Sequence, residues 1–316
     1  GCTEPIAVAL ASAKAAEVLG AKPEKLDVFL SANILKNAMG VGIPGTGMVG
    51  LPIAVALGAL IGKSEYELEV LRDLSPESLE EGKQMVDSHC INIALKENVD
   101  KLYIEIVAYA ADNFSKVVIS HEHTNFVYVE KNGEILLDKR HEYSSDDDAH
   151  DEDFTLTFNT VCDFALESPL DDISFILKTA ELNKKAALAS VKANYGHTVS
   201  KTISGPVGKK YMGDSSFTHM LTLTSAACDA RMDGAMIPVM SNSGSGNQGI
   251  AATLPVVSFA EDMNASEEQL IRALMLSHLM VIYIKQSLGR LSALCGCVVA
   301  ATGASCAITW LMGGNR

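Results

Sequence analysis

The sequence is short of positive charge. It holds 25 Lys and Arg against 39 Asp and Glu, which gives a formal net charge of −14. Proteins that bind duplex nucleic acid normally carry a basic stripe, so we expect no nucleic-acid partner. The negative field also repels anions, so a small anionic substrate would have to be held by local hydrogen-bond donors.

Cysteine is sparse, and no segment of the sequence resembles a secretion signal. Seven cysteines among 316 residues are too few, and odd in number, for a disulfide framework. No basic segment followed by an apolar one stands at the start. We therefore expect a cytoplasmic protein. The sequence also lacks an initiator Met and stops after Gly313-Gly314-Asn315-Arg316, so we expect it to be a piece of a longer product.

Uninterrupted apolar helices are missing as well. Residues 39–62 and 293–312 carry no charge and are long enough to span a bilayer. The first stretch is broken repeatedly by Gly and Pro, and the second is rich in Ala, Gly, Ser and Cys, which insert weakly into membranes. We expect no membrane partner, and we expect the second stretch to be a buried, closely packed helix.

Local patterns predict an α+β protein of two domains. An acidic run at 146–153 is typical of a solvated connection. We expect an N-terminal α/β domain with a mainly antiparallel sheet at 1–155 and an all-α domain at 156–316. In the first domain we expect helices at 6–19 and 51–61, strands at 26–30, 103–109, 116–120 and 126–130, and a hairpin turn at Asn132-Gly133. In the second we expect helices at 173–195, 217–232 and 267–288, the last with a capping box of Ser266 and Gln269.

Two segments resemble nucleotide-binding motifs in their residues but not in their context or spacing. Residues 40–45 fit GxGxxG, but they do not follow a strand directly and contain Pro44. Residues 58–64 resemble a phosphate loop, but the first Gly is one position too close to the Gly-Lys-Ser that follows, and the segment falls at the end of a predicted helix. We reject both.

A histidine pair follows a predicted strand. His121 and His123 would point to the same face if the strand continued through them, which would allow a metal pair. A third ligand is not evident, so we favour a solvated loop or a polar strand end over a metal site. His123, with Thr124 and Asn125, stays a candidate for substrate contact.

A run of small and amide residues is the most unusual feature inside the chain. It spans 241–249, and an apolar, helix-like segment starts at Ile250. Successive backbone N–H groups before a helix N-terminus form a cradle for a carboxylate or a phosphate. A flexible surface linker is an equally weighted alternative.

Cysteines stand at both ends of the chain. If 291–311 forms one helix, Cys295 and Cys297 lie about 200° apart around its axis, and Cys295 lies about 16 Å from Cys306 along it. At most one of the three can then serve a given metal site. Cys2 falls at the start of a predicted helix, where the dipole favours a thiolate. We interpret Cys90, Cys162 and Cys228 as small apolar core residues.

Several segments together resemble one enzyme family. They are the opening Gly-Cys-Thr-Glu-Pro, Lys36-Asn37 with the Ile-Pro-Gly-Thr of 43–46, the 241–249 run, and Cys295-Gly296-Cys297 with the closing Gly313-Gly314. In this order they resemble the L-cysteine desulfidase family, which is related to the iron–sulfur L-serine dehydratases and their alpha chain. The resemblance covers essentially the whole chain, with a beta-like first domain and an alpha-like second domain.

The resemblance implies a cofactor and a set of site residues. It implies a 4Fe–4S cluster held by three cysteines, two of them Cys2 and Cys295, with the third beyond residue 316. It implies that the small amino-acid substrate is bound by residues of three segments: Thr3, Glu4, Asn37, Ser241, Asn242, Ser243, Gly244, Ser245, Gly246 and Asn247. Lys36, His123 and a loop serine are all candidates for the catalytic base.

The implied reaction is β-elimination without pyridoxal phosphate. L-Cysteine would give pyruvate, ammonia and sulfide, and L-serine is the alternative substrate for the same chemistry. From a different class, the chain could be an amino-acid-binding or regulatory scaffold without a cluster. Helices rich in small residues would suit a homodimer.

Overall fold

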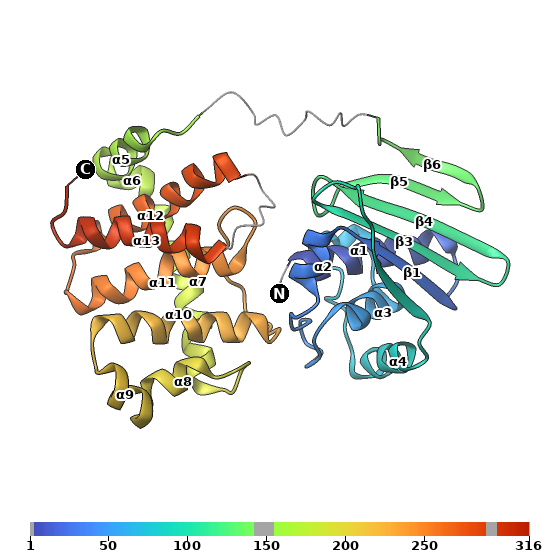
Figure 1. Ribbon diagram of the computed structural model, residues 1–316, viewed down its shortest axis with the longest axis horizontal. Helices are drawn as coiled ribbons and strands as arrows, with labels where there is room; N and C mark the ends of the chain where they lie inside the picture. Colours follow the sequence, from blue (N-terminus) through green and yellow to red (C-terminus); the bar gives the residue numbers. More distant parts are fainter. Residues whose placement is uncertain (1–2, 142–154, 289–295, 316) are drawn as a thin grey trace. The chain divides into compact units, whose positions relative to one another are not determined.

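The computed structural model describes residues 3–141, 155–288 and 296–315. The chain divides into two compact units, Gly1–Asp148 and Ala149–Arg316, so the division falls within the acidic run (Figure 1). The first unit combines a sheet with helices, and the described part of the second is helical. The predicted α+β class is confirmed.

The first unit is built on a six-stranded sheet with the order β2-β1-β3-β4-β5-β6. β1 and β2 run parallel, and every other neighbouring pair is antiparallel, as predicted for a mainly antiparallel sheet. The strands are β1 (Lys25–Leu30), β2 (Ile91–Leu95), β3 (Tyr103–Ala110), β4 (Asn113–Ser120), β5 (Phe126–Lys131) and β6 (Glu134–Asp138).

Alternating side chains and one turn explain much of this sheet. In β3, Ile104, Ile106 and Ala108 are fully buried on the same face, because successive side chains of a strand point to opposite sides. Asn132 and Gly133 have φ angles of 50° and 86°, and this left-handed pair joins β5 to β6 as the sequence predicts.

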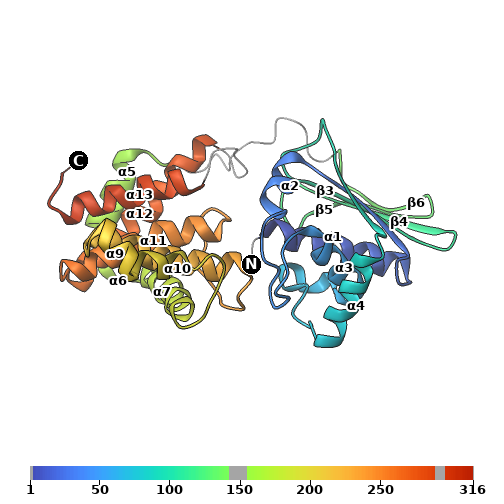
Figure 2. The same cartoon turned by 60° about the horizontal axis from the view of Figure 1, so that its bottom comes forward.

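One long helix lies on the buried face of the sheet, and a second helix packs against it. α1 (Thr3–Leu19) contacts β3 and β4 and packs against α3 (Leu51–Ile61), as Figure 2 shows. The two helices meet closely at Gly58, where an added Cβ would lie 2.2 Å from the carbonyl oxygen of Ala9. Three further segments complete the unit: α2 (Ala32–Ala38), the 3₁₀ turn η1 (Ser64–Glu69) and α4 (Pro76–Asp87).

The second unit is a bundle centred on α11. This helix packs against α10, α12 and α13, and the core includes Val257, Leu274 and Ala307. The segments are α5 (Phe158–Glu167), α6 (Leu170–Ile173), η2 (Ser174–Ile176), α7 (Leu177–Lys192), α8 (Val199–Ser204), α9 (Pro206–Met212), α10 (Ser216–Met232), α11 (Gly246–Asp262), α12 (Glu267–Leu288) and α13 (Gly296–Leu311).

Helix ends in this unit test the sequence predictions directly. The capping box is present: the Ser266 N–H donates to Gln269 Oε1 at 2.8 Å, and the Gln269 N–H donates to Ser266 Oγ at 3.2 Å. The helix predicted at 173–195 is shorter, because a 3₁₀ turn precedes α7 and Ala193 is extended (φ −117°, ψ −178°). Of the helix predicted at 291–311, residues 291–295 lie outside the described part of the chain.

Among the helices of the described ranges, none is long and apolar enough to cross a bilayer.

Candidate functional site

The run 241–249, called the hairpin below, consists of a tight turn at 242–245 followed by the first residues of α11. The Asn242 N–H donates to the Ser245 carbonyl at 3.1 Å, and the Ser245 N–H donates back to the Asn242 carbonyl at 3.0 Å. Between them, Ser243 and Gly244 have positive φ angles of 47° and 78°. Ser245 then caps the helix, since its Oγ accepts the N–H of Gln248 at 3.4 Å. The segment is therefore a hydrogen-bonded turn with a defined shape.

Two buried amide side chains hold the base of the hairpin in place through hydrogen bonds. Asn242 is 5% exposed, and its Nδ2 lies 3.0 Å from His278 Nδ1 and 3.1 Å from the His278 carbonyl oxygen. Gln248 is 2% exposed and donates from Nε2 to the Asn242 carbonyl at 3.1 Å. Ser243 and Gly244 at the tip are exposed. The hairpin thus presents its tip while its base is held in the core.

His278 links this base to the middle of α11. Its Nε2 lies 2.9 Å from Thr253 Oγ1, and the Thr253 hydroxyl donates to the Gly249 carbonyl at 2.7 Å. Asn183 Nδ2 also donates to Thr253 Oγ1 at 3.2 Å, while the Asn183 Oδ1 accepts the Met240 N–H at 2.8 Å. Burial lowers the pKa of His278 to about 4, so the ring is neutral at neutral pH.

Positive charge lies beside the start of α11. Arg231, from α10, is 6% exposed, and a Cβ added to Gly246 would lie 2.2 Å from its Nε. Gly249 is equally constrained, because a Cβ there would lie 2.1 Å from the Met240 carbonyl oxygen. Asn247 donates from Nδ2 to Met232 Sδ at 3.2 Å, and its Oδ1 is buried without a hydrogen-bond partner among the described residues. Glycines therefore let the backbone approach a buried guanidinium where the helix begins.

The predicted cluster ligands Cys2 and Cys295 both lie outside the described residues. Gly296, the neighbour of Cys295, begins α13 against the hairpin, since a Cβ on it would lie 3.0 Å from Gln248 Oε1. Across the described ranges, no group of three or more His, Cys, Asp or Glu side chains could hold a metal ion.

The remaining cysteines of the second unit differ in exposure. Cys297 is exposed and Cys306 is half-buried on α13. Burial raises the pKa of the Cys306 thiol, and burial raises that of Cys228 to about 11. Cys162 is buried in the core, in keeping with its interpretation as an apolar residue.

Three predicted site residues meet within the first unit. Asn37 of α2 donates from Nδ2 to Glu4 Oε1 of α1 at 3.2 Å. Burial lowers the pKa of His123, and the nearby charge of Glu4 partly opposes that shift. The His123 Nε2 atom is buried and has no hydrogen-bond partner among the residues described. Thr3 is half-buried at the start of α1, whereas Lys36 is exposed on α2.

The histidine pair lies in a turn beyond the end of a strand, and of the two alternatives favoured above the loop is the one observed. β4 ends at Ser120, and His121 has a φ of 69°, so the same-face geometry of a strand does not apply. His121 Nε2 lies 3.7 Å from Asp100 Oδ2.

Sequence reasoning missed the residues that support the hairpin from outside the run 241–249. These are Asn183, Arg231, Thr253 and His278. One signal was available: His278 is an ionisable residue among apolar neighbours in a long predicted helix, and such a residue needs a buried partner.

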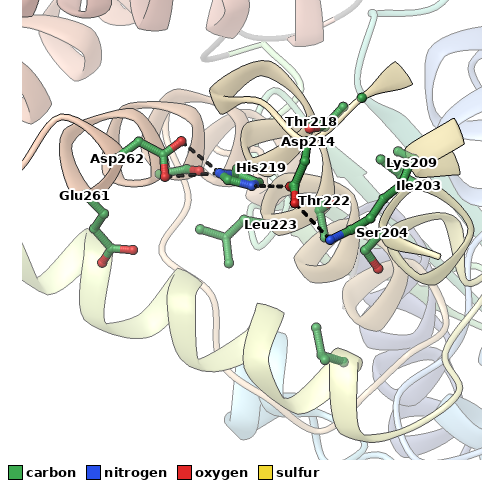
Figure 3. A pocket seen from close by; sticks show the side chains of 13 residues that line it. Ile203, Ser204, Lys209, Asp214, Thr218, His219, Thr222, Leu223, Glu261 and Asp262 are labelled. Atoms are coloured by element: carbon green, nitrogen blue, oxygen red, sulfur yellow. Dashed lines mark hydrogen bonds and ion pairs between the residues drawn. The ribbon is translucent and has the colours of Figure 1, made fainter. Parts of the chain in front are cut away.

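A separate pocket of about 320 Å³ lies near α8, α9, α10 and the end of α11 (Figure 3). His219 spans it: Nδ1 lies 2.9 Å from Asp262 Oδ2, and Nε2 lies 2.9 Å from Asp214 Oδ1. Lys209 Nζ continues the chain of charges to Asp214 Oδ2 at 3.1 Å. Hydrogen bonds to Asp214 and Asp262 raise the pKa of His219. All these charges are paired with one another.

The fold and the hairpin define a two-unit α+β protein whose helical unit carries a small-residue turn at a helix N-terminus. The family model for the serine dehydratase alpha chain matches residues 65–316. The chain therefore belongs to the serine dehydratase alpha chain family, which is named for a lyase.

Curated relatives cover the whole chain. A UPF0597 protein of Parabacteroides distasonis is 75% identical over 317 residues, spanning 100% of this chain and 74% of the relative. A UPF0597 protein of Bacteroides fragilis is 66% identical over 316 residues, spanning 100% of this chain and 73% of the relative. A UPF0597 protein of Porphyromonas gingivalis is 56% identical over 321 residues, spanning 100% of this chain and 74% of the relative.

Proposed function

We propose that this chain belongs to an iron–sulfur-dependent lyase that converts L-cysteine to pyruvate, ammonia and sulfide by β-elimination. L-Serine deamination by the same route is the second candidate. The observation that carries the proposal is the hairpin at 241–249, built against a buried arginine at the N-terminus of α11.

The hairpin supports binding of an α-carboxylate. The first turn of a helix leaves N–H groups without intrahelical partners, and its dipole favours an anion by about 0.3–1 kcal/mol. Arg231 adds a guanidinium beside Gly246, and hydrogen bonds to charged groups contribute about 1.5–3 kcal/mol each. This local attraction offsets the repulsion expected from a chain of net charge −14.

His123 is the best supported of the candidate bases. Burial lowers its pKa, so the ring is neutral at neutral pH and its buried Nε2 can accept a proton. Lys36 is exposed, so it lacks the desolvation that makes a lysine an effective base. Ser243 donates its hydroxyl to Asn242 Oδ1 at 2.8 Å, which occupies the one proton of that group.

The cofactor belongs to the same proposal. Cys2 and Cys295 would hold a 4Fe–4S cluster together with a third cysteine beyond residue 316, as the resemblance implies. When bound, such a cluster supplies a Lewis-acidic iron that polarises the leaving sulfur or oxygen. Loss of the α-proton and of the β-substituent leaves aminoacrylate, which water converts to pyruvate and ammonia.

The test is anaerobic reconstitution of the full-length protein with iron and sulfide. We expect pyruvate and sulfide in equal amounts from L-cysteine, and the ratio of kcat/KM for cysteine and serine identifies the substrate. We expect His123→Asn to lower kcat by about 10²–10⁴-fold, with Lys36→Met as the matched comparison. A full-length protein that forms no cluster but still binds amino acids would refute the lyase and support the amino-acid-binding or regulatory scaffold instead.

A further inference from the structure

We propose that His278 is a positioning residue that holds the hairpin at 241–249 in its binding shape through Asn242. This inference rests on the proposed function, because it assigns the hairpin to the substrate carboxylate. His278 does not reach the hairpin tip itself: it is 5% exposed, and its ring contacts Asn242 on one side and Thr253 on the other.

The contacts determine the tautomer of the ring. Asn242 Nδ2 faces the His278 carbonyl oxygen at 3.1 Å, and a carbonyl can only accept, so this amide atom is the donating nitrogen. The same Nδ2 lies 3.0 Å from His278 Nδ1, which must therefore accept. The Thr253 hydroxyl donates its single proton to the Gly249 carbonyl at 2.7 Å. Its oxygen can therefore only accept from His278 Nε2, so Nε2 is the protonated ring nitrogen. The ring is neutral and carries its proton on Nε2.

This tautomer makes His278 a connector with one acceptor and one donor. It ties the first residue of the turn, Asn242, to Thr253, which lies two turns into α11. Two more amides belong to the same network. Asn183 Nδ2 donates to Thr253 Oγ1 at 3.2 Å, and Gln248 Nε2 donates to the Asn242 carbonyl at 3.1 Å. A network whose members are all satisfied specifies one arrangement of the groups it joins.

Glutamine is the informative replacement. Its side-chain amide offers an acceptor oxygen and a donor nitrogen, which can replace the acceptor Nδ1 and the donor Nε2 of the neutral ring, whereas leucine fills similar space and offers neither. In the full-length reconstituted enzyme we expect His278→Leu to raise KM for the amino acid about tenfold, which corresponds to about 1.4 kcal/mol. We expect His278→Gln to stay within about threefold of the wild type. His219→Gln, at an exposed histidine of the same unit, is the matched control and should leave KM unchanged.

A direct readout does not depend on activity. In the full chain labelled with ¹⁵N-histidine, we expect one ring to show the spectrum of a neutral Nε2–H tautomer at pH 7, and this signal to vanish in His278→Gln. A cationic ring or an Nδ1–H tautomer at His278 would overturn the inference even if the variants misfold. So would a folded His278→Leu with unchanged KM, or an equal rise in KM for both variants. A wild-type protein without turnover would refute the proposed function, while the tautomer result would stand.

Discussion

Replacing Thr253 with valine removes one hydroxyl and leaves the volume of the side chain almost unchanged. Thr253 is fully buried, and its Oγ1 accepts from His278 Nε2 and from Asn183 Nδ2. Valine leaves the His278 N–H buried without an acceptor, which costs about 1–3 kcal/mol. Asn183 Nδ2 keeps its contact with the Met240 carbonyl at 3.3 Å and therefore loses less. We expect the free energy of unfolding of the second unit to fall by about 2–4 kcal/mol.

Thr253→Ser is the matched control. It keeps the hydroxyl and removes one buried methyl group, which costs about 1 kcal/mol. The assay is urea unfolding followed by tryptophan fluorescence, because the single Trp, Trp310, lies on α13 and reports on the second unit alone. A two-unit chain can unfold in more than one step, so a probe confined to one unit is needed. If valine destabilises this unit no more than serine does, the hydroxyl is not the link that the geometry indicates.

Three further predictions use the same unit. Gly249→Ala places a Cβ 2.1 Å from the Met240 carbonyl oxygen, so we expect a loss of at least 2 kcal/mol in the same unfolding assay; an unchanged urea midpoint would contradict it. The pKa of His219 is raised by its two carboxylates, so its contribution to stability is complete below the unfolded pKa of about 6.5 and is lost as pH rises through the folded pKa. The ring is 47% exposed, so the effect is small. We expect His219→Gln to narrow the difference between the urea midpoints at pH 6 and pH 9, and an unaltered difference would show that the contacts of His219 with Asp214 and Asp262 do not stabilise the unit. Arg231→Gln should raise KM for the amino acid about tenfold or more with a smaller change in kcat, whereas a fall in kcat alone would place Arg231 in the chemical step.

Short-range patterns predicted the parts of the fold that depend on neighbouring residues. The antiparallel strands, the turn at Asn132-Gly133 and the capping box at Ser266 all follow from side-chain alternation, positive φ and local hydrogen bonds. Other features escaped prediction because their stability comes from packing. β2 is held by parallel pairing with β1 from far along the chain. The first turn of α11 begins at Gly246, before the apolar segment that predicted this helix and among weak helix formers.

The candidate site divides in the same way. By itself, the sequence determined that 241–249 is a small-residue segment before a helix, and that Glu4, Asn37 and His123 merit attention. Only the tertiary structure decided that Asn37 and His123 both lie beside Glu4, and that Asn242 rests on His278. Asn242 and His278 are 36 positions apart in the sequence, and they form a hydrogen bond because α11 packs against α12. Local propensity acts over a few residues, whereas such buried pairs depend on long-range packing that places both partners out of reach of water.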